Sequence, residues 1–135
     1  MLSNNFQPLK PRWEELYQHA CFAELYVYSD PQTATIKLRC FVEAMVGILY
    51  RELNLRGELG DKLVEKIQAS SFEEIVGSPI CQKLHAVRVL GNKAAHGGKI
   101  NTEQSLQLLK EAYLLGQWLY KTYSGEIYDD YPDFV

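Results

Sequence analysis

The sequence predicts an all-α protein that folds as one compact helical bundle. Helix-start signals recur along the chain, and in two places a capping residue is followed by proline at the first helical position. Between these signals apolar residues recur at helical spacing, whereas the alternation typical of β-strands is missing. The 135 residues are 47% hydrophobic and 23% charged, which suits a single domain with its own core. We expect two long and two or three shorter helices, followed by a long C-terminal helix.

The first two helices are predicted by prolines that mark their starts. Pro11 fits the first turn of a helix over about residues 13–28. Asp30 followed by Pro31 predicts a second helix over about residues 31–53. This second helix should be central, because it is apolar almost all round. A helix with one side exposed to solvent would carry polar residues along that side. Between positions 34 and 50 its only charged residues are Lys37, Arg39 and Glu43.

Four further helices are predicted downstream. Gly60-Asp61 marks the start of a short helix, and Ser71 to Glu74 fits the capping-box pattern of another. Ser78-Pro79 repeats the combination of cap and proline, and Gly97-Gly98 is typical of a left-handed helix C-terminus. The expected ranges are about 60–70, 71–77, 78–97 and, for the long last helix, 102–123.

The helical domain is expected to cover residues 1–124. Residues 125–135 are acidic and aromatic and contain Pro132. This composition is typical of a linker, or of the cut edge of a longer chain that continues into further domains.

Cysteine usage and the lack of targeting segments predict a cytoplasmic location. Cys21, Cys40 and Cys81 are an odd number and form no Cys-x-x-Cys pair, so neither a disulfide framework nor a zinc site is indicated. We expect small buried thiols in a reducing compartment. No apolar run approaches the ~18 residues of a membrane helix, and no leader pattern opens the chain. We therefore expect no membrane contact.

Charge is distributed unevenly along the chain. The formal net charge of −3 argues against a strongly basic nucleic-acid-binding surface. Between Glu74 and Glu103, however, there is no acidic residue. Two interpretations stay open: a local nucleic-acid-binding patch, or an ordinary solvated helix face with a mild positive bias. The candidate patch residues are Lys83, Lys93 and Lys99.

A polar row on the predicted 78–97 helix is the strongest candidate for a site. His85, Arg88, Asn92 and His96 fall within about 80° of one another around a helix. Apolar and small residues occupy the opposite side, which we expect to pack. The guanidinium of arginine can bind phosphate through paired N–H donors, and the amide of asparagine can donate or accept a hydrogen bond. The imidazole of histidine can exchange protons near neutral pH. Such a row could serve phosphodiester chemistry. The apolar and small residues of the opposite side are Ala86, Val87, Leu90, Gly91 and Ala94.

A second polar pair, Arg39 and Glu43, lies on the central helix. An unpaired charge buried there would cost several kcal/mol, so both side chains need partners. The other polar row in the core-forming helices runs through Asn92, and we predict that the two rows face each other. They would form either a functional pocket or a structural network that fixes helix register. No motif predicts a metal site. The pocket residues are Arg39, Glu43, His85, Arg88, Asn92 and His96.

Residues 6–123 resemble a known family. The matching features are Asp30-Pro31 followed by Ile36 to Glu43, and above all Arg88 to His96. On these residues the chain resembles the small N-terminal helical domain of restriction (R) subunits of type I restriction enzymes and related helicase-containing proteins. That domain is similar to the HEPN superfamily, helical bundles in which an Arg-polar-x3-His motif often forms a ribonuclease site at a dimer interface. The resemblance implies a HEPN-like bundle.

The resemblance also implies a function. The domain would be an accessory part of a restriction system whose larger subunit hydrolyses ATP with Mg²⁺, translocates DNA and cleaves it through domains absent from this chain. The domain itself would need no cofactor. It would contribute contacts to DNA or RNA, to other subunits or domains of the complex, or to a second copy of itself.

One position departs from the ribonuclease motif. Gly91 stands directly before Asn92, where the ribonucleases carry arginine, and Arg88 lies one turn earlier. We therefore expect the candidate catalytic residues Arg88, Asn92 and His96 to bind or pack rather than catalyse, and Gly91 to allow a close helix approach. Two alternatives are a metal-independent HEPN-type ribonuclease, in which Arg88 holds the phosphate and His96 is the general acid/base, and a stand-alone helical interaction module.

Overall fold

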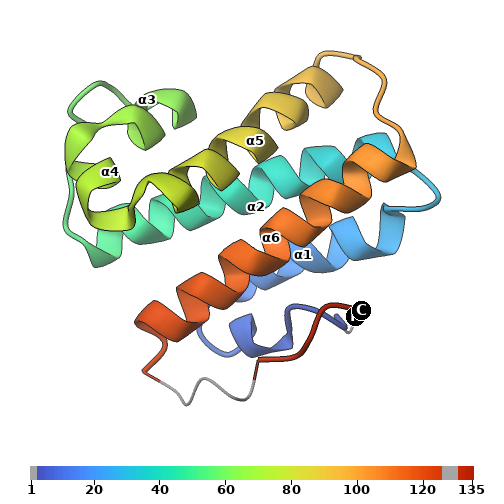
Figure 1. Cartoon of the computed structure of the whole chain (residues 1–135), viewed down its shortest axis with the longest axis horizontal. Helices are drawn as coiled ribbons and strands as arrows, with labels where there is room; N and C mark the ends of the chain where they lie inside the picture. The colour runs from blue at the N-terminus through green and yellow to red at the C-terminus, as the bar shows by residue number, and fades with distance from the viewer. Residues whose placement is uncertain (1–2, 126–130) are drawn as a thin grey trace.

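The computed structural model describes residues 3–125 and 131–135 and contains only helices and connecting segments over that part of the chain (Figure 1). The all-α expectation is confirmed. None of the helices in the described part is long and apolar enough to span a membrane. The elements are the 3-10 helix η1 (Gln7–Leu9) and the α-helices α1 (Glu14–Tyr26), α2 (Pro31–Glu52), α3 (Leu63–Gln68), α4 (Ser70–Val76), α5 (Ser78–Ala95) and α6 (Thr102–Tyr123).

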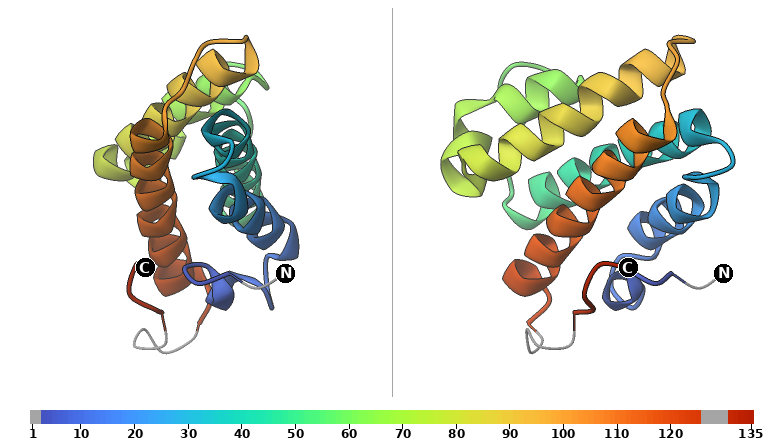
Figure 2. Two further views of the ribbon diagram at one scale, coloured as in Figure 1. Left: turned by 90° about the vertical axis from the view of Figure 1, so that its right-hand side faces the viewer. Right: turned by 45° about the vertical axis from the view of Figure 1, so that its right-hand side comes forward.

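Helix α2 is the central helix, as predicted. It packs against α1, α3, α5 and α6 and runs through the middle of the bundle in Figure 1. Figure 2 shows α6 standing beside the α1 and α2 pair, with η1 below them. The apolar stretch of α2 supplies much of the core, because ten of its residues are buried. These are Ala34, Thr35, Leu38, Phe41, Val42, Met45, Val46, Ile48, Leu49 and Tyr50.

Local caps fix the ends of the helices that build the candidate site. The Asp30 carboxylate accepts a hydrogen bond from the Thr33 backbone N–H at 3.1 Å at the start of α2. Asn101 and Gln104 form a reciprocal capping box at the start of α6. Helix α5 ends in a Schellman motif, because Gly97 has φ +86° and the Gly98 N–H donates to the Lys93 carbonyl at 2.8 Å.

Two predicted caps are wrong. Helix α4 begins at Ser70 with Ala69 as its N-cap, and no capping box forms at Ser71 to Glu74. Helix α5 takes Gly77 rather than Ser78 as its N-cap. Ala69 is fully buried between α3 and α4, so tertiary packing rather than a side-chain cap sets that boundary.

The segment expected to be a linker is packed in part. Tyr131 is only 7% exposed, and the Val135 N–H donates to the Asn5 side-chain oxygen at 2.8 Å. Residues 131–135 therefore pack against the helical part of the chain, and the domain boundary at 124 stays a prediction. Residues 126–130 of the expected linker lie outside the described residues. Cys21 and Cys81 are buried free thiols as expected, whereas Cys40 is half-buried.

Candidate functional site

Helix α5 presents the predicted polar row beside a narrow packing stripe. Its buried residues are Cys81, Leu84, Val87, Gly91 and Ala94, and the polar row lies next to this stripe. The prediction that Ala86 also packs is wrong, since Ala86 is exposed. Position 86 is one residue, about 100° of rotation, beyond the stripe at Val87.

Gly91 marks the closest approach of α5 to α2. A Cβ atom on this residue would lie 2.5 Å from the Arg39 Cβ and 3.0 Å from the Arg39 Cγ. Real side chains do not approach so closely, so any residue but glycine would push the two helices apart. The prediction of a close helix approach at Gly91 is confirmed. As a result, the aliphatic part of Arg39 lies directly on the α5 backbone.

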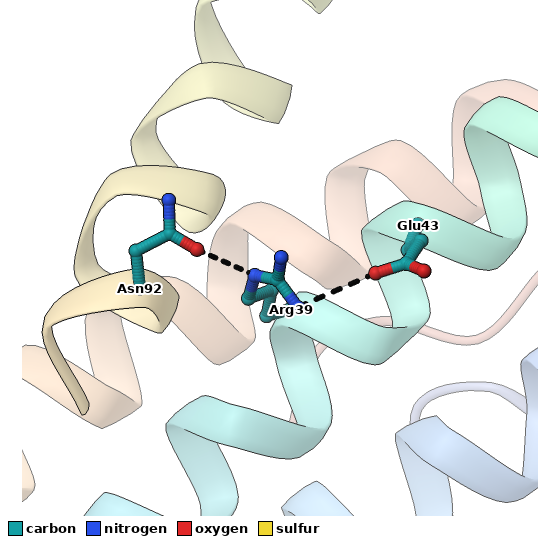
Figure 3. A network of polar contacts seen from close by, with 3 residues as sticks. All are labelled: Arg39, Glu43 and Asn92. Carbon is teal, nitrogen blue, oxygen red and sulfur yellow. Dashed lines mark hydrogen bonds and ion pairs between the residues drawn. The ribbon is translucent and has the colours of Figure 1, made fainter. Parts of the chain in front are cut away.

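The Arg39 guanidinium then reaches Asn92 (Figure 3). Its Nε donates to the Asn92 Oδ1 at 2.6 Å, and its Nη1 lies 3.3 Å from the Glu43 Oε2. The prediction that the two polar rows face each other is confirmed for Arg39 and Asn92. The Arg39 side chain is 32% exposed and that of Glu43 59%, so the more buried Asn92 bond orients the guanidinium more than the ion pair does. These bonds occupy two of its five N–H donors.

The two rows form one wall of a groove of about 480 Å³. The other wall comes from α3 and the residues just before it. Five of the six predicted pocket residues line this groove, and His85 does not. Four cationic side chains and two carboxylates line it, so its local charge is positive although the chain carries −3. The lining residues are Arg39, Glu43, Asp61, Lys62, Leu63, Val64, Lys66, Arg88, Asn92 and His96.

The α3 side of this groove was missed from the sequence, where residues 60–70 look peripheral. Lys62 and Lys66 carry two of its four cations. The Lys66 Nζ also lies 5.4 Å from the centre of the Tyr50 ring of α2, a cation–π contact that holds α3 against the central helix. A pair of lysines four residues apart was the only available signal, and it gives no hint of which helix they face.

A family model described as a domain of unknown function (DUF4145) matches residues 22–123. The chain belongs to this family. The matched residues include all of α2, α3 and α5, so the whole groove lies within the DUF4145 domain.

The chain is also similar to a type I restriction enzyme subunit. It is 29% identical over 136 residues to the type I restriction enzyme EcoKI endonuclease subunit of Escherichia coli (strain K12), a match that covers 100% of this chain and 11% of that protein. No solved structure matches. The two matches together support a domain related to this class of subunit. The similarity to the HEPN superfamily stays a prediction.

His85 of the DUF4145 domain acts on the groove only through its neighbour. Its Nδ1 accepts a hydrogen bond from the Arg88 Nε at 3.3 Å. Burial, and secondarily the charge of Arg88, lower the pKa of His85 below its ordinary value. A neutral His85 keeps the accepting nitrogen free of a proton, so it can hold the Arg88 guanidinium at the edge of the groove.

His96 is placed at the end of α5 by the Schellman motif. It is the C-cap residue, and its backbone N–H donates to the Asn92 carbonyl at 3.0 Å. Its exposed side chain lines the groove together with Arg39, Arg88 and Asn92. The structure therefore brings two guanidinium groups, an amide and an imidazole to one surface. This set of groups can bind a phosphate and, through the imidazole, exchange a proton.

The predicted lysine patch is less continuous than the sequence indicates. Lys83 forms an ion pair with Glu111 of α6, with 2.9 Å between the Nζ and Oε2 atoms, and both side chains are half-buried. Its charge is therefore compensated within the domain. Lys93 and Lys99 are exposed near the end of α5, and their role in nucleic-acid binding stays a prediction.

A second hollow, of about 520 Å³, lies between α1 and α2. Its Arg12 donates to the Ser124 carbonyl at 3.1 Å and pairs with Glu52. Three glutamates line this hollow, and they offset its arginines. Its charge therefore fits an anionic ligand less well than that of the groove on α5. Over the described residues, no cluster of His, Cys, Asp or Glu could hold a metal ion.

Proposed function

We propose that this DUF4145 domain is an accessory domain of a type I restriction endonuclease subunit and that it contacts nucleic acid through the α2, α3 and α5 groove. The observation that carries the proposal is the similarity to the EcoKI endonuclease subunit, which extends over the entire chain. The chain spans about a ninth of that relative, 11% of its length. ATP hydrolysis and DNA cleavage, with the Mg²⁺ that they need, would belong to other parts of such a protein.

The groove supports a phosphate-binding role. Guanidinium and ammonium groups are the usual protein partners of phosphate oxygens, and such contacts position a protein on nucleic acid without reading its sequence. Arg39 is already oriented by Asn92, and Arg88 by His85. A ligand phosphate would therefore meet two guanidiniums that lose little conformational freedom on binding. In this proposal the ligand is duplex DNA, and contacts with other subunits or a second copy of the domain would use other surfaces.

Titration with labelled duplex DNA tests the proposal. Fluorescence anisotropy at several salt concentrations should give a binding constant that falls as salt rises. Arg88→Gln should weaken binding several-fold and lower the salt slope by about one, because one phosphate contact is lost. Lys121→Gln is the matched control, since it also removes one positive charge, at an exposed position near the end of α6. Equal binding by both variants and the unsubstituted chain would contradict the proposal.

A metal-independent ribonuclease is the second candidate function, and the position of the Arg39 side chain favours it. The Arg39 side chain crosses Gly91 and supplies a guanidinium beside Asn92, in the same groove as His96. Arg39 would hold a phosphate while His96 transfers protons. Incubation with single-stranded and structured RNA in EDTA tests this: His96→Ala should abolish cleavage, and Lys121→Gln should leave it unchanged. Cleavage by His96→Ala at the unsubstituted rate would eliminate the ribonuclease.

A further inference from the structure

The side of α6 that faces Phe6 and Leu9 contains a recess at Gly116. A Cβ atom on Gly116 would lie 2.8 Å from the Tyr131 hydroxyl oxygen, 3.2 Å from the Leu9 Cδ1 and 3.5 Å from the Phe6 Cδ1. The missing side chain therefore makes room for the end of the Tyr131 side chain. Phe6 and Leu9, both fully buried, form the other side of this recess. Tyr131 closes it and is itself 7% exposed.

Two aromatic side chains of the tail segment, which we define as residues 131–135, pack on aromatic residues of α6. The Tyr131 ring lies 5.7 Å from the Tyr113 ring and 5.5 Å from the Tyr120 ring. The Phe134 ring lies 5.4 Å from the Tyr113 ring in an edge-on arrangement. Such pairs add specificity to the burial of apolar area. The tail segment thus inserts two aromatic anchors, three residues apart, along one face of α6.

Backbone hydrogen bonds hold the tail segment at two further points. The Tyr113 hydroxyl donates to the Pro132 carbonyl at 2.6 Å, and the Val135 N–H donates to the Asn5 Oδ1 at 2.8 Å. Asn5 is held in place in turn, because its own N–H donates to Glu24 at 3.0 Å. The Asn5 backbone is therefore held by a contact that does not involve the tail segment.

These contacts are of the kinds that hold bound peptides. The tail segment has no helix or strand, and it is recognised through aromatic anchors and backbone groups, as bound peptides are. We propose that the surface formed by Asn5, Phe6, Leu9, Tyr113, Gly116 and Tyr120, here called the tail site, is a binding site for an extended Tyr-Pro-x-Phe peptide. Its resident ligand is the tail segment of the same chain. The tail segment and three of the six residues of the tail site lie outside residues 22–123, which the family match covers.

The test uses the full chain with both anchors removed, Tyr131→Ala with Phe134→Ala, and a synthetic peptide Tyr-Pro-Asp-Phe-Val as the probe. Titration of the ¹⁵N-labelled variant should shift the amide signals of Asn5 and Gly116 saturably. The unsubstituted chain should need at least about ten-fold more peptide to reach the same shifts, because its tethered tail competes at a millimolar effective concentration. A peptide with alanine at both aromatic positions should not bind.

Two further measurements distinguish recognition from loss of structure. Adding Gly116→Ala to the doubly substituted chain should weaken peptide binding about five-fold or more, because the methyl group fills the recess. The helix should be kept, because alanine has a higher helix propensity than glycine. Circular dichroism reports whether each variant keeps its helices. In the unsubstituted chain the Val135 amide should exchange its hydrogen slowly. The proposal would be overturned if the folded double variant showed no shifts on addition of the peptide. It would also be overturned if the Val135 amide exchanged its hydrogen as fast as in an unstructured chain.

Discussion

At the scale of single residues, Gly91 decides what the groove can be. It lets Arg39 lie against the α5 backbone, with 2.5 Å between a built Cβ on Gly91 and the Arg39 Cβ. From there the guanidinium reaches Asn92 at 2.6 Å. Gly91 therefore allows a guanidinium from α2 to reach the surface of α5. Arg39 supplies one of the four cations that line the groove.

Substitution of Gly91 tests the close contact. Gly91→Ala should destabilise the domain by about 1–2 kcal/mol, because overpacking costs about 1–3 kcal/mol and the gain in helix propensity returns up to about 1 kcal/mol. Gly47→Ala is the matched control, since a Cβ there would meet nothing closer than the Arg51 Nη1 at 3.8 Å. Urea unfolding should show that Gly47→Ala is neutral or stabilising. Two variants of equal stability would contradict the contact.

His85 gives the domain a pH-dependent stability. Burial and Arg88 lower its pKa in the folded state from the ordinary value of 6.5. As pH falls through this value, the unfolded chain binds the proton more readily than the folded chain, so stability falls. His85→Gln should therefore lose less stability between about pH 7.5 and 5.5 than the unsubstituted chain. Burial also lowers the pKa of His19, so some decline should remain. Urea unfolding at each pH measures this, and an equal loss of unfolding free energy in both chains would contradict this role of His85.

At the scale of helices, local signals predicted what local chemistry decides. Asp30 caps α2, and Asn101 caps α6, where the sequence places a helix start. The polar row on α5 was predictable because helical spacing alone puts its members together. The α3 wall of the groove was not, since it depends on how residues 54–62 return the chain to α2 and α5. The packing of Tyr131 and Phe134 was not predictable from the sequence, because the surface that they contact forms only after α6 has packed.

The end of α5 offers a test at this scale. Gly97 has φ +86°, and a Cβ there would meet nothing within 4 Å, so the cost of Gly97→Ala is conformational only. We expect a loss of about 1–2 kcal/mol in the free energy of unfolding. Gly97→Asn should cost less, because asparagine tolerates the left-handed region better. Thermal unfolding of the two variants measures the difference, and an equal loss from both would show that the Schellman motif does not set this end.

At the scale of the whole molecule, the two candidate binding surfaces lie on opposite sides of the bundle. Helices α3 and α5 lie on one side of α2, while η1 and the tail segment lie on the other (Figures 1 and 2). Variants of one surface should therefore leave the other intact. Because the chain carries a net charge of −3 while four cations and two carboxylates line the groove, we expect nucleic acid to bind near the groove rather than over the whole surface. Binding should accordingly be local and sensitive to salt.

The most direct test of the central claim is to map duplex DNA binding on the ¹⁵N-labelled domain at low salt. The account predicts saturable shifts of the Arg39 and Arg88 side-chain Nε–H signals and of the amides of Lys62, Lys66 and Asn92, with none at Gly116 or Val135. The same titration with RNA shows which nucleic acid the groove prefers. Saturation without change at Arg39 and Arg88, or shifts confined to the tail site, would contradict the claim that the α2, α3 and α5 groove is the functional surface of this domain.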